Sequence, residues 1–271
     1  MYPWRRILIP TDFSTASEWS FDTAVDMAGS TGAELVILHV RGTWGSQPDK
    51  LRFPADDSLY SYVEQHELEK VRDHVRRANA TIQTRLLVRK APHAGEEISR
   101  AAKSEEIDLI VMATHARHHV AHLIIGSTTM QILHEPPTPV LAIRYGVPRR
   151  RALRRIVVPV HLRQTSTAAA ELAAAIAKRD GAEVHLIIVC GDAERDAAET
   201  RVAEVERLFA TVPTRAIVSG KDIDREIVRY TDSSDADALF LNAGAHPLSD
   251  LKQEIIRQVS APVMVVPSPS S

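Results

Sequence analysis

The chain has 271 residues, and its 33 Lys and Arg against 35 Asp and Glu give a formal net charge of −2 at pH 7. This balance argues against broad electrostatic binding to nucleic acid or to an anionic membrane. The single cysteine, Cys190, excludes an internal disulfide framework and a cysteine-rich zinc site. No apolar run reaches the roughly 20 residues that a membrane helix needs, and the first residues lack the layout of a signal peptide. We therefore expect a soluble, cytoplasmic protein.

In chain order, the first half alternates short apolar runs with helical patterns. Strands are predicted at 6–11, 34–40, 84–90, 108–114 and 138–144, because each is a short apolar run with β-branched residues. Helices are predicted at 14–30, 57–80, 94–105 and from Gly126 to about Leu133. Ser14 is a candidate cap for the first of these helices.

The sequence then repeats itself. RRILIPT at 5–11 resembles RRIVVPV at 154–160, and GAELVILHV at 32–40 resembles GAEVHLIIV at 181–189. Both pairs are separated by 149 positions (154 − 5 and 181 − 32), so no gap lies between them. Such a repeat predicts that the second half has the fold of the first.

Two further pairs extend the repeat toward the end of each half. DLIVMATHA from Asp108 resembles DALFLNAGA from Asp237, and TPVLAI from Thr138 resembles APVMVV from Ala261. The order is kept and the spacing nearly so. We place the two domains at residues 1–147 and 152–271.

Strands that alternate with helices predict a mostly parallel sheet with right-handed crossovers and helices on both faces. Each half is therefore expected to be a doubly wound α/β domain with five parallel strands. Ligands of such folds bind beyond the carboxyl ends of the strands. In the first half, these ends lie at 10–12, 39–40 and 114–115.

Two features at these strand ends have the chemistry of a ligand site. Asp12 follows the first strand, where a carboxylate can accept a hydrogen bond from a ribose hydroxyl or an adenine amine; on this residue alone, a helix cap is the preferred interpretation. Gly126 precedes Ser127, Thr128 and Thr129, whose hydroxyls stand beside the unpaired N–H groups of a helix start. That combination favours a phosphate, and the alternative is an ordinary helix cap.

Together, the motifs ILIPTDFS, ELVILHV, DLIVMATHAR, GSTT and TPVLAIR resemble those of the universal stress protein family in its tandem two-domain form. The resemblance implies a Rossmann-like, adenine-nucleotide alpha-hydrolase-like fold and a role in the stress response through protein partners. ATP-binding members of that family carry a Gly, two residues, a Gly, nine residues, and then Gly-Ser or Gly-Thr. The spacing is kept here, but Ala113 and Ala116 replace the two glycines that precede Gly126 and Ser127.

The resemblance further implies a site for ATP or AMP in the first half, with Mg²⁺ accompanying ATP. Carried over position by position, its nucleotide-binding residues are Pro10, Thr11, Asp12, Val40, Ala113, His115, Ala116, Arg117, Gly126, Ser127 and Thr128. If the backbone at either alanine needs a positive φ, the residue is strained by about 1 kcal/mol or more. With negative φ at both positions the pocket would survive, so nucleotide binding stays open at this point.

The second half departs further from the nucleotide-binding pattern. His161 stands at the position of Asp12, and no Gly-Ser helix start follows the fourth strand. The offset between the halves falls from 129 at Asp237 to 123 at Pro262, so six residues of the phosphate loop are missing. We expect no nucleotide there, and a structural role instead. In the resulting internal pseudo-dimer TPVLAIR meets APVMVVP, because both strands would otherwise be exposed edges.

Several alternatives stay open. His115, His118, His119 and His122 could hold zinc or copper, and otherwise form a solvated polar loop. A ligand-free tandem scaffold would result if the two alanines close the pocket. A weak ATPase is the third alternative, although the sequence shows no obvious base for activating water and no G-x-S-x-G motif. External protein partners and a homodimer of the chain are left undetermined by the sequence.

Overall fold

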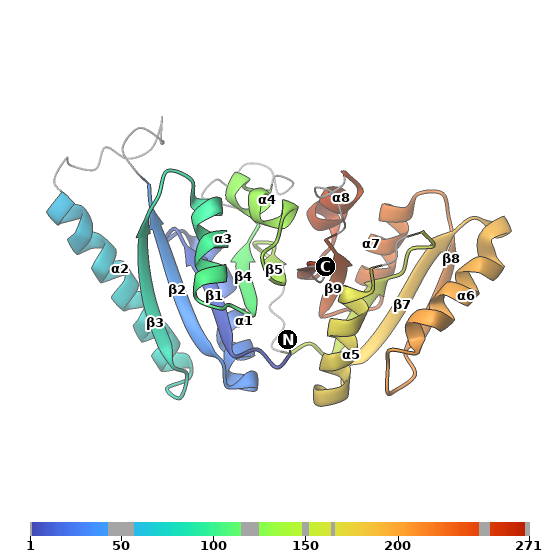
Figure 1. The fold of residues 1–271 in the computed structure, drawn as a ribbon. Helices are drawn as coiled ribbons and strands as arrows, with labels where there is room; N and C mark the ends of the chain where they lie inside the picture. The colour runs from blue at the N-terminus through green and yellow to red at the C-terminus, as the bar shows by residue number, and fades with distance from the viewer. Residues whose placement is uncertain are drawn as a thin grey trace.

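The structure, a computed structural model, describes residues 2–42, 57–114, 125–147, 152–163, 166–243 and 250–268 (Figure 1). The side chains of residues 57–60, 250 and 251 are not described. Within these ranges, no helix combines the length and the apolar character needed to cross a membrane.

Strands and helices alternate along both halves, as predicted (Figure 1). The first half contains β1 (Arg6–Thr11), α1 (Thr15–Thr31), β2 (Glu34–Arg41), α2 (Asp57–Ala78), β3 (Thr84–Lys90), α3 (Ala94–Ser104), β4 (Leu109–Ala113), α4 (Ser127–His134) and β5 (Val140–Ile143). The second half contains β6 (Arg155–Pro159), α5 (Ala168–Asp180), β7 (Glu183–Cys190), the short 3₁₀ helix η1 (Asp192–Glu194), α6 (Arg195–Glu206), β8 (Thr214–Ser219), α7 (Ile223–Ser233), β9 (Ala238–Asn242), α8 (Asp250–Gln258) and β10 (Val263–Val266).

All ten strands belong to one sheet, in the order β3-β2-β1-β4-β5-β10-β9-β6-β7-β8. Every neighbouring pair is parallel except β5 with β10. Each half is thus a doubly wound unit of five parallel strands, and the two units form the expected internal pseudo-dimer.

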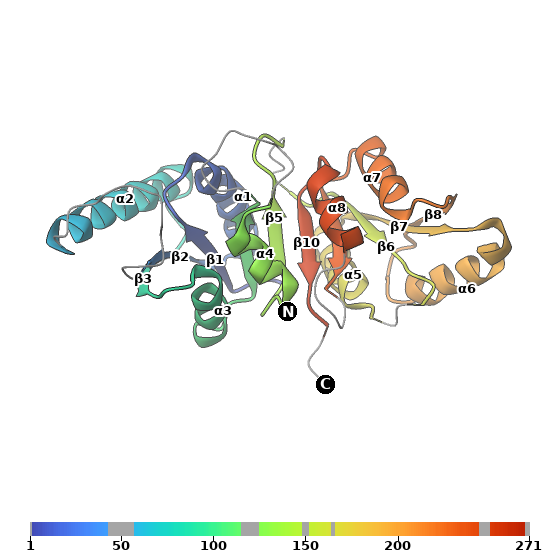
Figure 2. The ribbon, with the colours of Figure 1, turned by 90° about the horizontal axis from the view of Figure 1, so that it is seen from above.

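The junction between the halves is the antiparallel pair β5–β10, which lies at the centre of the molecule (Figure 2). Leu141 is opposite Met264, and Val140 is opposite Val265. All four side chains are at most 1% exposed. The predicted meeting of TPVLAIR with APVMVVP is confirmed, and each strand covers the apolar edge that the other would expose.

The core consists of two apolar clusters that both extend through the two halves. The first includes Leu141 and Met264 and is covered by residues of α1, α2, α5 and α6. The second includes Val140 and Val265 and is covered by residues of α3, α4, α7 and α8. Because residues two apart along a strand face the same side, the alternation along β5 and β10 supplies both clusters.

The repeat is visible in local geometry as well as in topology. Gly32 ends α1 at φ 73° and Gly181 ends α5 at φ 72°, where glycine adopts the left-handed conformation without strain. Asp108 accepts hydrogen bonds from the backbone N–H groups that open β1, and Asp237 does the same for β6. These paired residues have the same structural role in both halves, so we attribute them to the requirements of the fold.

We predict that Leu141→Ala and Met264→Ala each lower the free energy of unfolding by about 2–5 kcal/mol, because each leaves a cavity in the buried junction. In the double variant the two effects should be coupled by about 0.5 kcal/mol or more, since the residues are opposite each other. Urea unfolding measures both quantities. Leu35→Ala on β2 combined with Met264→Ala is the control and should be additive. Additivity of the junction pair would contradict the observed register.

Candidate functional site

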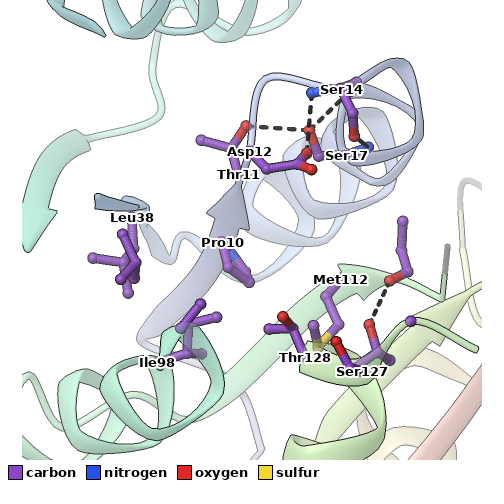
Figure 3. Close-up of a pocket in the computed structure, with 15 residues that line it drawn as sticks. Pro10, Thr11, Asp12, Ser14, Ser17, Leu38, Ile98, Met112, Ser127 and Thr128 are labelled. Atoms are coloured by element: carbon purple, nitrogen blue, oxygen red, sulfur yellow. Dashed lines mark hydrogen bonds between the residues drawn. The ribbon is translucent and has the colours of Figure 1, made fainter. Parts of the chain in front are cut away.

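A cavity of about 160 Å³ opens at the carboxyl ends of the first-half strands (Figure 3). Its walls come from the ends of β1, β2 and β4, from the first turns of α3, and from the start of α4. It brings together eight of the residues predicted from the sequence, namely Pro10, Thr11, Asp12, Val40, Ala113, Gly126, Ser127 and Thr128. The other three, His115, Ala116 and Arg117, lie outside the described residues, as do His118, His119 and His122.

The loop between β1 and α1 places Asp12 on the cavity. Asp12 Oδ1 accepts a hydrogen bond from the backbone N–H of Ser14 at 3.0 Å. Ser14 is the N-cap of α1, and its Oγ accepts from the N–H of Ser17 at 3.2 Å. Asp12 therefore orders the helix start, as the cap interpretation predicts, and it also lines the cavity. Its contact with a ligand stays a prediction. Phe13 between them has a positive φ of 59°, which is uncommon for a residue with a side chain.

A buried histidine supports this loop from the neighbouring strand. His39 Nδ1 lies 2.9 Å from the carbonyl oxygen of Thr11, so Nδ1 carries the proton and donates it. The imidazole also stacks on Phe13, with the ring centroids 4.4 Å apart. Burial lowers the pKa of His39 below its usual value of 6.5. The Thr11 carbonyl and the Glu64 carboxylate raise the pKa, but their effect is smaller. The neutral ring is therefore the form that the folded protein favours.

The far side of His39 faces an ion pair between α2 and the end of β2. Nε2 lies 3.4 Å from Glu64 Oε1, and it makes no hydrogen bond within the described residues. Glu64 is itself paired with Arg41 at the end of β2, and both side chains are largely buried. His39 thus connects the end of β1 to α2 and positions the loop that carries Asp12. This role was not predicted from the sequence, in which His39 was noted only as a residue at a strand end.

The start of α4 forms the opposite side of the cavity. Gly126 is the N-cap residue, and no side-chain capping hydrogen bond is made to the helix within the described residues. The N–H of Gly126 donates to the carbonyl of Thr114 at 2.7 Å, and Thr129 Oγ1 donates to that of Ala113 at 3.0 Å. These bonds attach the helix start to the end of β4. The first-turn N–H groups of a helix carry partial positive charge, which attracts anions.

Ala113 does not carry backbone strain. Within the described residues, the non-glycine residues with positive φ are Phe13, Glu106 and Asp235. Ala113 is the last residue of β4 and is absent from this set. The first of the two glycine replacements therefore leaves the cavity intact, while Ala116 lies outside the described residues.

Apolar side chains complete the cavity, and the sequence analysis missed them. Leu38, Ile98 and Met112 line it (Figure 3). Ala94 also belongs to the lining. Leu38 and Val40 alternate on β2, and Ala94 and Ile98 are four apart on α3, so each pair shares a face. The only signal in the sequence was this spacing, which is equally typical of core residues.

A doubly wound sheet of this kind, with a cavity beyond its strand ends, defines a Rossmann-like α/β protein. The model of the universal stress protein family matches residues 3–144 and again residues 152–267. The chain therefore belongs to the universal stress protein family and contains two copies of its domain in tandem.

Individual relatives agree with this assignment. A universal stress protein of Thermus aquaticus is 31% identical over 142 residues, which is 52% of this chain and 98% of that protein. One of Synechocystis is 44% identical over 52 residues, so the match spans 19% of this chain and only 18% of that relative. The crystal structure of a universal stress protein from Archaeoglobus fulgidus has a TM-score of 0.77 and 21% identity over 97% of this chain and 98% of that one, which shows the same fold.

We predict that stability falls as the pH is lowered below about 6.5, and that His39→Gln reduces this dependence. The folded-state pKa of His39 is lowered from 6.5, so between the two pKa values the unfolded chain binds a proton that the folded chain does not. Urea unfolding at pH 7.5 and pH 5.5 measures the difference. His66→Gln, at an exposed position on the same helix as Glu64, is the control. An unchanged pH dependence in His39→Gln would contradict this account.

Proposed function

We propose that the first half binds an adenine nucleotide, ATP or AMP, and that the protein acts in the cytoplasmic stress response through protein partners rather than by catalysis. The observation that carries the proposal is the convergence of Asp12, an apolar slot and the start of α4 on one cavity. These three features match the three parts of a nucleotide.

Each part has a counterpart in the cavity. Leu38, Ile98 and Met112 suit the flat, apolar faces of adenine. The Asp12 carboxylate suits hydroxyl or amine donors, and the N–H groups and hydroxyls of Ser127 and Thr128 suit phosphate. The enclosed volume of about 160 Å³ is smaller than a typical drug-sized pocket. It therefore suits the base and ribose, with the phosphates over the helix start.

The lining favours binding over hydrolysis. Among the described residues that line the cavity, Asp12 is the one with an ionisable side chain, and its Oδ1 is engaged by the N–H of Ser14. A general base must be within reach of the water that it activates. A magnesium ion accompanying ATP would be held mainly by phosphates and water, as is usual for this ion.

The two halves then have different roles. We place the nucleotide-binding domain at residues 1–147 and the second domain at 152–271. The second lacks the Gly-Ser helix start and six residues of the corresponding loop. Its β10 is a permanent partner for β5, which in a single domain would be left as an apolar edge.

Calorimetric titration of nucleotide-stripped protein with ATP tests the proposal. We expect one site per chain, with binding lost in Asp12→Ala. Asp12→Asn should weaken it about tenfold or more, because the amide oxygen still accepts from Ser14 while the charge is removed. His161→Ala, at the matching position of the second half, is the control and should bind normally.

No heat at millimolar ATP would contradict the proposal and support the scaffold alternative. Release of phosphate with stoichiometric protein would support the weak ATPase instead. Metal retained by the purified protein and lost on mutating His118 and His122 would support a metal site in the histidine loop.

We predict that Ala113→Gly changes the affinity for ATP by less than about threefold. The reason is that Ala113 has no positive φ for a glycine to relieve. The same titration measures this. A gain of tenfold or more would contradict the conclusion that the alanine fits the cavity without strain.

A further inference from the structure

A second cavity, of about 540 Å³, opens at the carboxyl ends of the second-half strands. From the sequence we expect only a structural role for this half. Its lining comes from the loop after β6, from β7, from η1 and from the first turns of α7, and consists of Val160, His161, Leu162, Arg163, Ile187, Val189, Glu194, Ile223 and Ile227.

This cavity is the structural counterpart of the first one. At the repeat offset of 149, Asp12 corresponds to His161 and Ser14 to Arg163, while Leu38 and Val40 correspond to Ile187 and Val189. At the offset of 129 that relates Asp108 to Asp237, Ala94 corresponds to Ile223 and Ile98 to Ile227. The second half has therefore kept the ligand cavity of the fold although it lacks the Gly-Ser helix start.

The polar groups at these matched positions have the opposite character. Asp12 and Ser14 offer oxygen acceptors, whereas His161 and Arg163 offer N–H donors. Arg163 has no hydrogen bond or ion pair within the described part of the chain, and His161 has no hydrogen bond there. Burial and the nearby Lys252 lower the pKa of His161. Among the described residues of the lining, Glu194 is the acidic one, and its Oε2 accepts from the N–H of Gly191 at 3.3 Å beside η1.

The remaining wall is apolar. Ile227 is 2% exposed and Val189 is 9% exposed, while Ile223 at the rim is 36% exposed. A cavity of this size with a few convergent donors is typical of a site for a small organic molecule. A guanidinium and an imidazole N–H on the lining of one cavity suit a carboxylate, since a carboxylate accepts from both groups and pairs with arginine in a bidentate manner.

We propose that the second half binds a small carboxylate with an apolar body, its carboxylate at His161 and Arg163 and its body against Ile187, Ile223 and Ile227. This site does not depend on nucleotide binding in the first half. The protein then has two cavities at equivalent positions of the repeat. The first suits a nucleotide and the second suits a small carboxylate.

The test uses the full chain and 4-fluorobenzoate, with the line width of its ¹⁹F NMR signal as the readout. The neutral isostere 4-fluorobenzamide is the ligand control. We expect the carboxylate to bind at least tenfold more tightly than the amide. His161→Asp and Arg163→Ser, which install the first-half residues, should each weaken binding about tenfold or more. Asp12→Ala should leave it unchanged.

A further variant separates a loss of binding from a loss of folding. Ile223→Trp adds bulk at the exposed rim and should abolish binding while leaving the thermal unfolding temperature within a few degrees of the parent, which circular dichroism measures. The proposal is overturned if 4-fluorobenzoate does not bind at several millimolar, if the amide binds equally well, or if the folded second-half variants keep the parent affinity.

Discussion

The antiparallel pairing of β5 with β10 is the contact on which the rest of the molecule depends. Each half ends its sheet in an apolar strand, and an exposed strand of this kind would pair with another chain. Placing Leu141 opposite Met264 covers both edges within one chain and makes the two cores continuous. Among the described residues that line the two cavities, none belongs to β5 or β10. The junction therefore joins the halves, and other strands form the cavities.

The two halves have kept the constraints of the fold and changed those of the site. Gly32 and Gly181 retain the same left-handed helix end, and Asp108 and Asp237 retain the same bonds to the first strand of each half. In contrast, His161 occupies the position of Asp12 where the first strand of each half meets its cavity. Replacing a residue that orders the backbone lowers the stability of the fold. A residue that contacts a ligand can differ between the halves if their ligands differ.

The fold class was predictable from the sequence because each strand is a short apolar run and the repeat indicated that the second half has the fold of the first. β3 was predicted to the residue at 84–90, whereas β4 begins after Asp108, whose carboxylate is used to hold the start of β1. The polar part of the site followed from motifs. Its apolar walls did not, because Ile98 and Met112 look like core residues until the sheet is assembled. The second cavity was not predicted, because the absence of a phosphate-binding motif does not indicate whether the strand ends and helices around it still enclose a cavity.

We propose that the two matched cavities of this sheet differ in the chemistry of the ligands that they bind. Ile98 and Ile227 are matched reporters, one in each cavity. Methyl NMR of isoleucine-labelled protein, assigned with Ile98→Val and Ile227→Val, measures both at once. We expect ATP to shift the Ile98 methyl signal and leave that of Ile227 unchanged, and 4-fluorobenzoate to do the reverse. Shifts of both signals by ATP, or of neither signal by either ligand, would contradict the claim.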